Sequence, residues 1–166
     1  METIAVYSEQ PIKTYGIGVE TGLCLLSAVV DTARMAVLNR SSFSPASLTG
    51  RLMMVSATPV DGGRLLVHCV TSAPPPMPAE AESAQWPMAV VCGVELVFFH
   101  GPHYGDRYGI AAAAFDALAA KSVPVLSAAC SGASVYVVVP QGRAADASAA
   151  LQTAFVVPSP EAGQTT

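Results

Sequence analysis

Apolar and polar positions follow the clearest pattern in the second half of the chain. A run rich in β-branched and aromatic residues, Val94–Phe99, predicts a strand. After a glycine-containing loop, apolar residues recur at helical spacing over Ile110–Lys121 and predict a helix. Two further apolar runs, Val123–Ala129 and Ala133–Val139, predict strands, and the amphipathic segment Ala144–Phe155 predicts a second helix. The second half therefore has the order β-α-β-β-α.

The first half of the chain predicts a similar order from a weaker pattern. Apolar residues at helical spacing over Leu23–Ala33 predict a helix. The segment Arg64–Val70 fits a strand by its β-branched content and a helix by its position in the order. We favour the helix, because Asp61 suits an N-cap and both halves then have the same order. Strands are expected at Ile4–Tyr7, Ile12–Ile17, Met35–Asn39, Leu52–Ala57 and Met88–Cys92.

Several segments of these two halves resemble the regulatory region of aspartate kinase, which is built from ACT domains. In the second half, Gly101–Gly109 followed by the alanine-rich helix from Ile110 matches that region in register, as do Leu126 and the strand end at Val137–Pro140. In the first half, a strand and a loop closing on Gly22 resemble the start of the first ACT repeat. The resemblance implies an α+β fold of two ferredoxin-like βαββαβ ACT repeats, whose antiparallel sheets carry helices on one face.

The resemblance also divides the chain. The first repeat is expected over residues 1–92, with a proline-rich connection at 73–87, and the second over residues 93–157. Residues 158–166 are expected to form a flexible tail. Because the first twenty residues carry no lysine-bearing phosphate motif, we expect no kinase catalytic domain and interpret the chain as a free-standing relative of the aspartate kinase regulatory β-subunit.

The composition restricts the class of protein. Of the 166 residues, 52% are hydrophobic and 12% are charged, which excludes a disordered chain and implies that apolar surface is hidden against a second copy or a partner. We therefore expect a homodimer. The net charge of −4 argues against a nucleic-acid partner. Since no apolar window is long enough to cross a membrane and the start lacks a signal-peptide pattern, we expect a cytoplasmic protein without membrane contact.

The residue types that usually carry chemistry form no catalytic or metal-binding pattern. His100 and His103 stand in an expected loop rather than on one helical face, which is not the geometry of a helical metal pair. The four cysteines lie in apolar runs without C-x-x-C spacing, so we expect buried, reduced thiols at Cys24, Cys69, Cys92 and Cys130. We predict no catalytic residue, no metal site and no cofactor.

The loops before the expected helices form the candidate ligand site. The first turn of a helix offers free N–H groups and a positive dipole end, which suit the carboxylate of an amino acid, and glycines allow close approach. The resemblance implies that an effector such as lysine or threonine lies between ACT repeats, where it touches this loop and the strand after the first helix. The expected effector-binding residues are Gly18, Val19, Glu20, Thr21, Gly22, Asn39, Ser41, Ser42, Asp106, Arg107, Tyr108, Gly109, Ser127, Ala128 and Ala129.

Three functions compete at this point. The first is a non-catalytic regulatory protein that senses an amino acid and acts allosterically on a partner, such as an aspartate kinase or another amino-acid enzyme. The second is an ACT dimer that serves as a structural or assembly subunit without a ligand. It is favoured by departures from the family, whose Ser-Thr-Ser-Glu is replaced here by Ser127-Ala128-Ala129-Cys130. The third is an enzyme with a new site around His100, His103, Tyr104 and Asp106.

Overall fold

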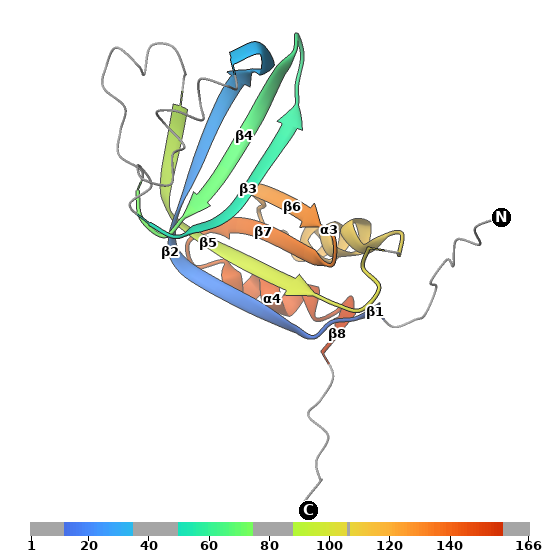
Figure 1. Cartoon of the computed structure of the whole chain (residues 1–166). Coiled ribbons are helices and arrows are strands. Elements are labelled where there is room, and N and C mark those ends of the chain that lie inside the picture. Colours follow the sequence, from blue (N-terminus) through green and yellow to red (C-terminus); the bar gives the residue numbers. More distant parts are fainter. Residues whose placement is uncertain (1–11, 35–49, 75–87, 106, 158–166) are drawn as a thin grey trace, which may run out of the picture. The chain divides into compact units, whose positions relative to one another are not determined.

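The computed structural model describes residues 12–34, 50–74, 88–105 and 107–157. The elements in chain order are β1 (Ile12–Lys13), β2 (Gly16–Asp31), the 3-10 helix η1 (Thr32–Arg34), β3 (Leu52–Pro59), β4 (Arg64–Thr71), β5 (Met88–His100), α3 (Ile110–Ala120), β6 (Ser127–Ser131), β7 (Ser134–Pro140), α4 (Ala144–Leu151) and β8 (Phe155–Val156). Of the described strands, six are hydrogen-bonded in the order β3-β4-β2-β5-β7-β6, and β1 and β8 form a separate parallel pair (Figure 1).

The chain folds into two compact units that share the two longest strands. Unit 1 comprises Met1–Val19 and Leu96–Thr166, and unit 2 comprises Glu20–Glu95. Both β2 and β5 therefore run from one unit into the other. The two repeats that we predict at residues 1–92 and 93–157 remain a prediction, because these units group residues by packing and not by repeat.

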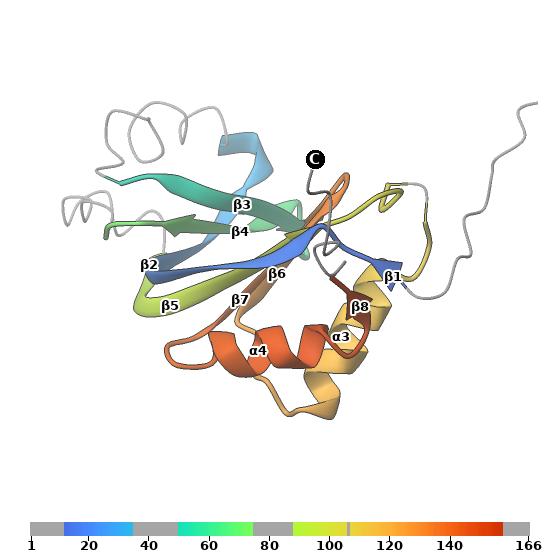
Figure 2. The same cartoon turned by 90° about the horizontal axis from the view of Figure 1, so that it is seen from below.

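Unit 1 has the order β-α-β-β-α-β from β5 to β8, and its helices α3 and α4 lie on the same face of the strands (Figure 2). The helix predicted at Ile110–Lys121 is confirmed. It buries Ile110, Ala114, Ala117 and Leu118, which are spaced to face one side. Ile110, Ala114 and Leu118 share one core with strand residues such as Phe99 and Val137. The predicted α+β fold class, with an antiparallel sheet and helices, is confirmed.

The second helix of unit 1 is shorter than predicted. It begins at Ala144 as expected but ends at Leu151. The hydroxyl of Thr153 donates to the carbonyl of Ala150 at 2.7 Å, which satisfies a carbonyl at the end of the helix. The chain then turns into β8, where Phe155 pairs with Ile12. The apolar spacing continues past the end of the helix, because Phe155 in β8 is buried in the same core as α4.

In unit 2 the predicted helix at Leu23–Ala33 is wrong, since these residues form the larger part of β2 and the start of η1. The physical reason is burial on both faces of the strand. Four successive residues, Leu23 to Leu26, are each 5% exposed or less. A strand covered on both faces reads as a continuous apolar run, which periodicity does not separate from a buried helix.

The predicted helix at Arg64–Val70 is also wrong, because this segment is the strand β4. Figure 1 shows β4 between β3 and β2, and it pairs antiparallel with both. Gly62 and Gly63 have φ of 59° and 71°, and the N–H of Arg64 donates to the carbonyl of Asp61 at 3.2 Å. Two successive positive φ angles are typical of a two-residue hairpin turn. Asp61 therefore opens a turn rather than capping a helix.

Most of the predicted strands are confirmed with shifted ends. Leu52–Ala57 lies in β3, Ala133–Val139 corresponds to β7, and Val123–Ala129 contributes only its last residues to β6. Met88–Cys92 and Val94–Phe99, predicted as two strands, form one strand, β5. The expected strand Ile12–Ile17 is split between β1 and the start of β2. The described residues do not include the predicted strands Ile4–Tyr7 and Met35–Asn39, the tail 158–166 or residues 75–87 of the proline-rich connection.

The cysteines differ from the expectation of four buried thiols. Cys24 on β2 and Cys92 on β5 form a disulfide, because these neighbouring strands bring their Cα atoms to 4.0 Å. Cys69 is a buried free thiol as expected, and burial raises its pKa to about 11. Cys130 is free but exposed, since it lies near the end of the strand β6. The sequence pattern does not indicate which cysteines share neighbouring strands.

Candidate functional site

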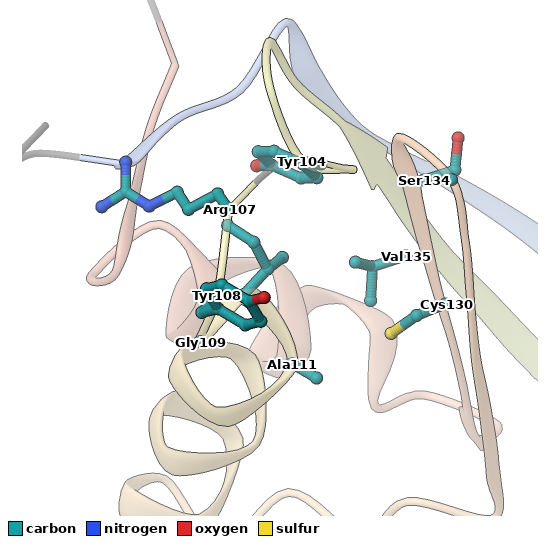
Figure 3. Close-up of a pocket in the computed structure, with 10 residues that line it drawn as sticks. Tyr104, Arg107, Tyr108, Gly109, Ala111, Cys130, Ser134 and Val135 are labelled. Carbon is teal, nitrogen blue, oxygen red and sulfur yellow. The ribbon is translucent and has the colours of Figure 1, made fainter. Parts of the chain in front are cut away.

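A cavity of about 230 Å³ lies in unit 1 at the start of α3. The residues that matter most for its chemistry are Tyr104, Arg107, Tyr108, Gly109, Cys130 and Ser134. Figure 3 shows that the first four come from the loop before α3 and its start, whereas Cys130 and Ser134 come from the facing hairpin of β6 and β7. The cavity is thus formed between a helix start and the end of a strand pair.

The loop before α3 has a shape that only particular residues allow. Gly101 is buried, and a Cβ built there would lie 2.5 Å from the carbonyl oxygen of Lys13 and would also clash with the ring of Tyr104. Tyr104 is 6% exposed and packs edge-on against Phe99. Gly109 has φ of 88°, a left-handed conformation that favours glycine. The absence of a side chain at Gly101 therefore lets Tyr104 and the loop close over β1.

The start of α3 is open to a ligand. Gly109 is the N-cap residue and provides no side-chain hydrogen bond to the first turn. The N–H groups of a first helical turn have no partner within the helix, and they form the positive end of the helix dipole. An anionic group in the cavity would be stabilised by these N–H groups.

The side chains that line the cavity add one positive charge and several neutral polar groups. Arg107 is half-buried, and Figure 3 shows its side chain extending from the loop before α3 away from Cys130 and Ser134, toward the outside of the cavity. Tyr108, 81% exposed, lies at the mouth. Cys130 is exposed as a residue, and partial desolvation of its thiol raises the pKa of that group. None of the described lining residues is acidic. The cavity therefore suits a small ligand with a carboxylate.

The structure brings together part of the predicted site from the second half of the chain. Arg107, Tyr108 and Gly109 line the cavity, whereas Asp106 lies outside the described residues, and effector binding by any of them stays a prediction. The predicted residues 127–129 lie on β6, paired with residues 136–138 of β7, and are not among the lining residues. Sequence reasoning missed Ser134 as a lining residue. The available signal was the glycine turn between the two apolar runs, which places Cys130 and Ser134 at one end of a hairpin.

The predicted site in the first half does not have the expected surroundings. Residues 18–22 lie within β2, so they do not form a loop before a helix. Gly18 faces the ring of Phe98, and Glu20 pairs with Arg51 at 2.9 Å. The predicted site residues Asn39, Ser41 and Ser42 lie outside the described residues.

The histidines of the alternative enzyme site do not line the cavity. The ring of His100 instead lies 5.4 Å from that of Tyr15, centroid to centroid. Within the described ranges no group of three acidic, histidine or cysteine side chains is placed to hold a metal ion. No described helix is long and apolar enough to cross a membrane.

The fold is of the ferredoxin-like α+β type, and solved regulatory subunits of aspartate kinase share it. A regulatory subunit of aspartate kinase from Thermus thermophilus, solved free of ligand, matches with a TM-score of 0.64 at 14% identity, over 89% of this chain and 100% of that one. The corresponding subunit from Thermus flavus matches with a TM-score of 0.65 at 14% identity, over 86% and 98%. The aspartate kinase from Synechocystis matches with a TM-score of 0.66 at 19% identity, over 95% of this chain and 29% of that one.

The TM-scores of 0.64 to 0.66 show a shared fold, and at identities of 14–19% these matches show the fold alone. No protein-family model matches the sequence, and no curated protein matches it significantly.

Proposed function

We propose that this chain is a non-catalytic regulatory protein that binds a small amino acid at the cavity beside α3 and acts on a partner enzyme such as an aspartate kinase. The observation that carries the proposal is an open helix start, with an arginine and no acidic residue among the described lining residues, in a fold shared with regulatory subunits of that enzyme. Its action requires that the amino acid bind differently to two states of the assembly.

The cavity supports a ligand of amino-acid size. Its volume of about 230 Å³ is below the range of pockets for drug-sized ligands. The ligand carboxylate lies at the first turn of α3, and Arg107 adds a second favourable charge. Ser134 lies on the opposite wall, and Figure 3 shows its hydroxyl pointing away from Cys130 and the start of α3. In this arrangement the ligand connects the start of the helix with the hairpin of β6 and β7.

Replacing Arg107 by alanine should weaken binding of the effector by about tenfold, because a charge-assisted hydrogen bond contributes roughly 1.5–3 kcal/mol. The effector is first identified by thermal shift against the standard amino acids, since a ligand that binds the folded state alone raises the apparent stability. Isothermal titration of the wild type and Arg107→Ala then gives the change in affinity.

The matched control is Arg64→Ala, which removes an exposed arginine of unit 2 that pairs with Asp61 in a turn. We expect this control to bind as tightly as the wild type. If no amino acid raises the melting temperature, ligand sensing is wrong for this chain. If both variants bind alike, the cavity is not the site.

The partner is tested separately. Adding the chain to an aspartate kinase from the same organism should change its activity, and the change should depend on the effector found above. Size-exclusion chromatography of the mixture should show the two proteins eluting together. Separate elution with unchanged kinase activity would remove this enzyme as the partner, while other amino-acid enzymes are tested in the same way.

The second function, a structural dimer without ligand, rests on exposed apolar side chains. Val55 on the edge strand β3 is 53% exposed and Val91 on β5 is 51% exposed. A second copy would cover such surface. Sedimentation that shows a dimer, together with a flat response to every amino acid, would favour this function over the first.

A further inference from the structure

The disulfide between Cys24 and Cys92 lies where the chain enters and leaves unit 2. That unit is the single segment Glu20–Glu95, so the chain enters it along β2 and leaves it along β5. The disulfide joins these two strands inside unit 2, near both connections. Cys24 and Cys92 lie four and three residues from the two ends of unit 2 (24 − 20 and 95 − 92), where it is linked to the rest of the chain.

The two strands are irregular beside this bond. Gly22 on β2 and Gly93 on β5 have φ of 70° and 77°, which is not extended backbone. A Cβ built on Gly22 would meet no atom within 4 Å, so the glycine serves the backbone conformation and not close packing. Glycines of this kind mark bulges and bends and weaken the hydrogen-bond ladder of a sheet. The covalent bond joins the strands beside these two irregular positions.

The bond is accessible from one side. Cys92 is exposed, whereas Cys24 is 3% exposed. Thiol–disulfide exchange begins with attack of a thiolate on a sulfur of the bond, and Cys92 is the more exposed of the two residues. In the cytoplasm, where we expect this chain, thiols are kept reduced, and the disulfides that do form are usually transient or redox-sensing. This environment favours a reversible bond over a permanent one.

We propose that Cys24–Cys92 is a reversible redox lock, which clamps β2 to β5 when oxidised and lets both connections of unit 2 bend when reduced. A dithiol is the reductant. Its first thiolate attacks Sγ of Cys92, forms a mixed disulfide and releases Cys24, which takes up a proton. Its second thiol then displaces Cys92 and closes the disulfide of the reductant. Two electrons and two protons pass from the dithiol to the cysteine pair.

The test uses the full chain purified in air, with and without dithiothreitol under native conditions. Alkylation followed by mass mapping should leave Cys24 and Cys92 unlabelled before reduction and label both after it, and reoxidation should protect them again. Amide exchange in Glu20–Asp31 and Met88–Glu95 should become about tenfold faster on reduction, while exchange in the helices of unit 1 changes little.

Two variants separate this lock from other effects of the reductant. Cys92→Ala should show the fast exchange with and without dithiothreitol, and Cys130→Ala, which removes an exposed thiol outside the pair, should respond as the wild type does. The wild-type measurement stands without either variant if one fails to fold.

Three results would overturn the proposal. If Cys24 and Cys92 are reduced only after the chain unfolds, the disulfide is a permanent structural bond. Unchanged exchange in the two strand segments on reduction would show that the bond locks nothing. Equal acceleration in α3 and α4 would show a general loss of stability in place of a local release.

Discussion

Replacing Phe155 by alanine should lower the free energy of unfolding by about 3–5 kcal/mol, because it removes a large buried ring and leaves a cavity. Phe155 is 1% exposed, and its ring centroid lies 4.6 Å from that of Phe99 and 6.2 Å from that of Tyr104. It also begins β8, which holds β1 against the core through the pairing with Ile12. Urea unfolding followed by circular dichroism measures the change.

Phe115→Ala is the matched control for this variant. Phe115 lies on α3 and is 42% exposed, so the same chemical change creates no enclosed cavity there. We expect it to cost less than about 1 kcal/mol. Equal losses in the two variants would mean that the aromatic group around Phe99 does not form the core of unit 1.

Replacing Gly101 by alanine should destabilise the protein by roughly 1–3 kcal/mol, because the added methyl group would force the surrounding atoms apart. The contact is with the backbone oxygen of Lys13, at 2.5 Å, and with the buried ring of Tyr104. Neither group is the free end of a flexible side chain, so neither can move aside at low cost. The shift of Tyr104 should also weaken effector binding, since its ring lines the cavity.

Gly105→Ala tests the same substitution in the same loop without the clash. A Cβ built on Gly105 meets no atom within 4 Å. This variant should unfold within about 0.5 kcal/mol of the wild type, as expected for an exposed position without special backbone geometry. A cost at Gly105 similar to that at Gly101 would show that loop flexibility, and not the clash with Lys13 and Tyr104, explains both losses.

The sequence indicated only one of the two walls of the candidate site. The glycine-containing loop before an alanine-rich helix indicated Arg107, Tyr108 and Gly109, because the loop and the helix are adjacent in the chain. The opposite wall depends on a hairpin that comes later in the chain, so Ser134 was missed. In the first half, residues 18–22 were expected to form a loop before a helix. The residues that follow them form a strand instead, so no helix start is present there to bind a ligand.

The sequence by itself determined the elements whose pattern is local. The helix α3 follows from its own spacing of apolar residues, and β7 follows from a run of valines that ends at Pro140. Only the tertiary structure decided that β2 and β4 are strands. Residues Leu23–Leu26 of β2 are buried on both faces, and such a strand presents the same apolar run as a buried helix. The strand β4 is defined by its pairing with β2 and β3. The disulfide was decided at the same level, since the pairing of β2 with β5 brings Cys24 and Cys92 together from distant parts of the chain.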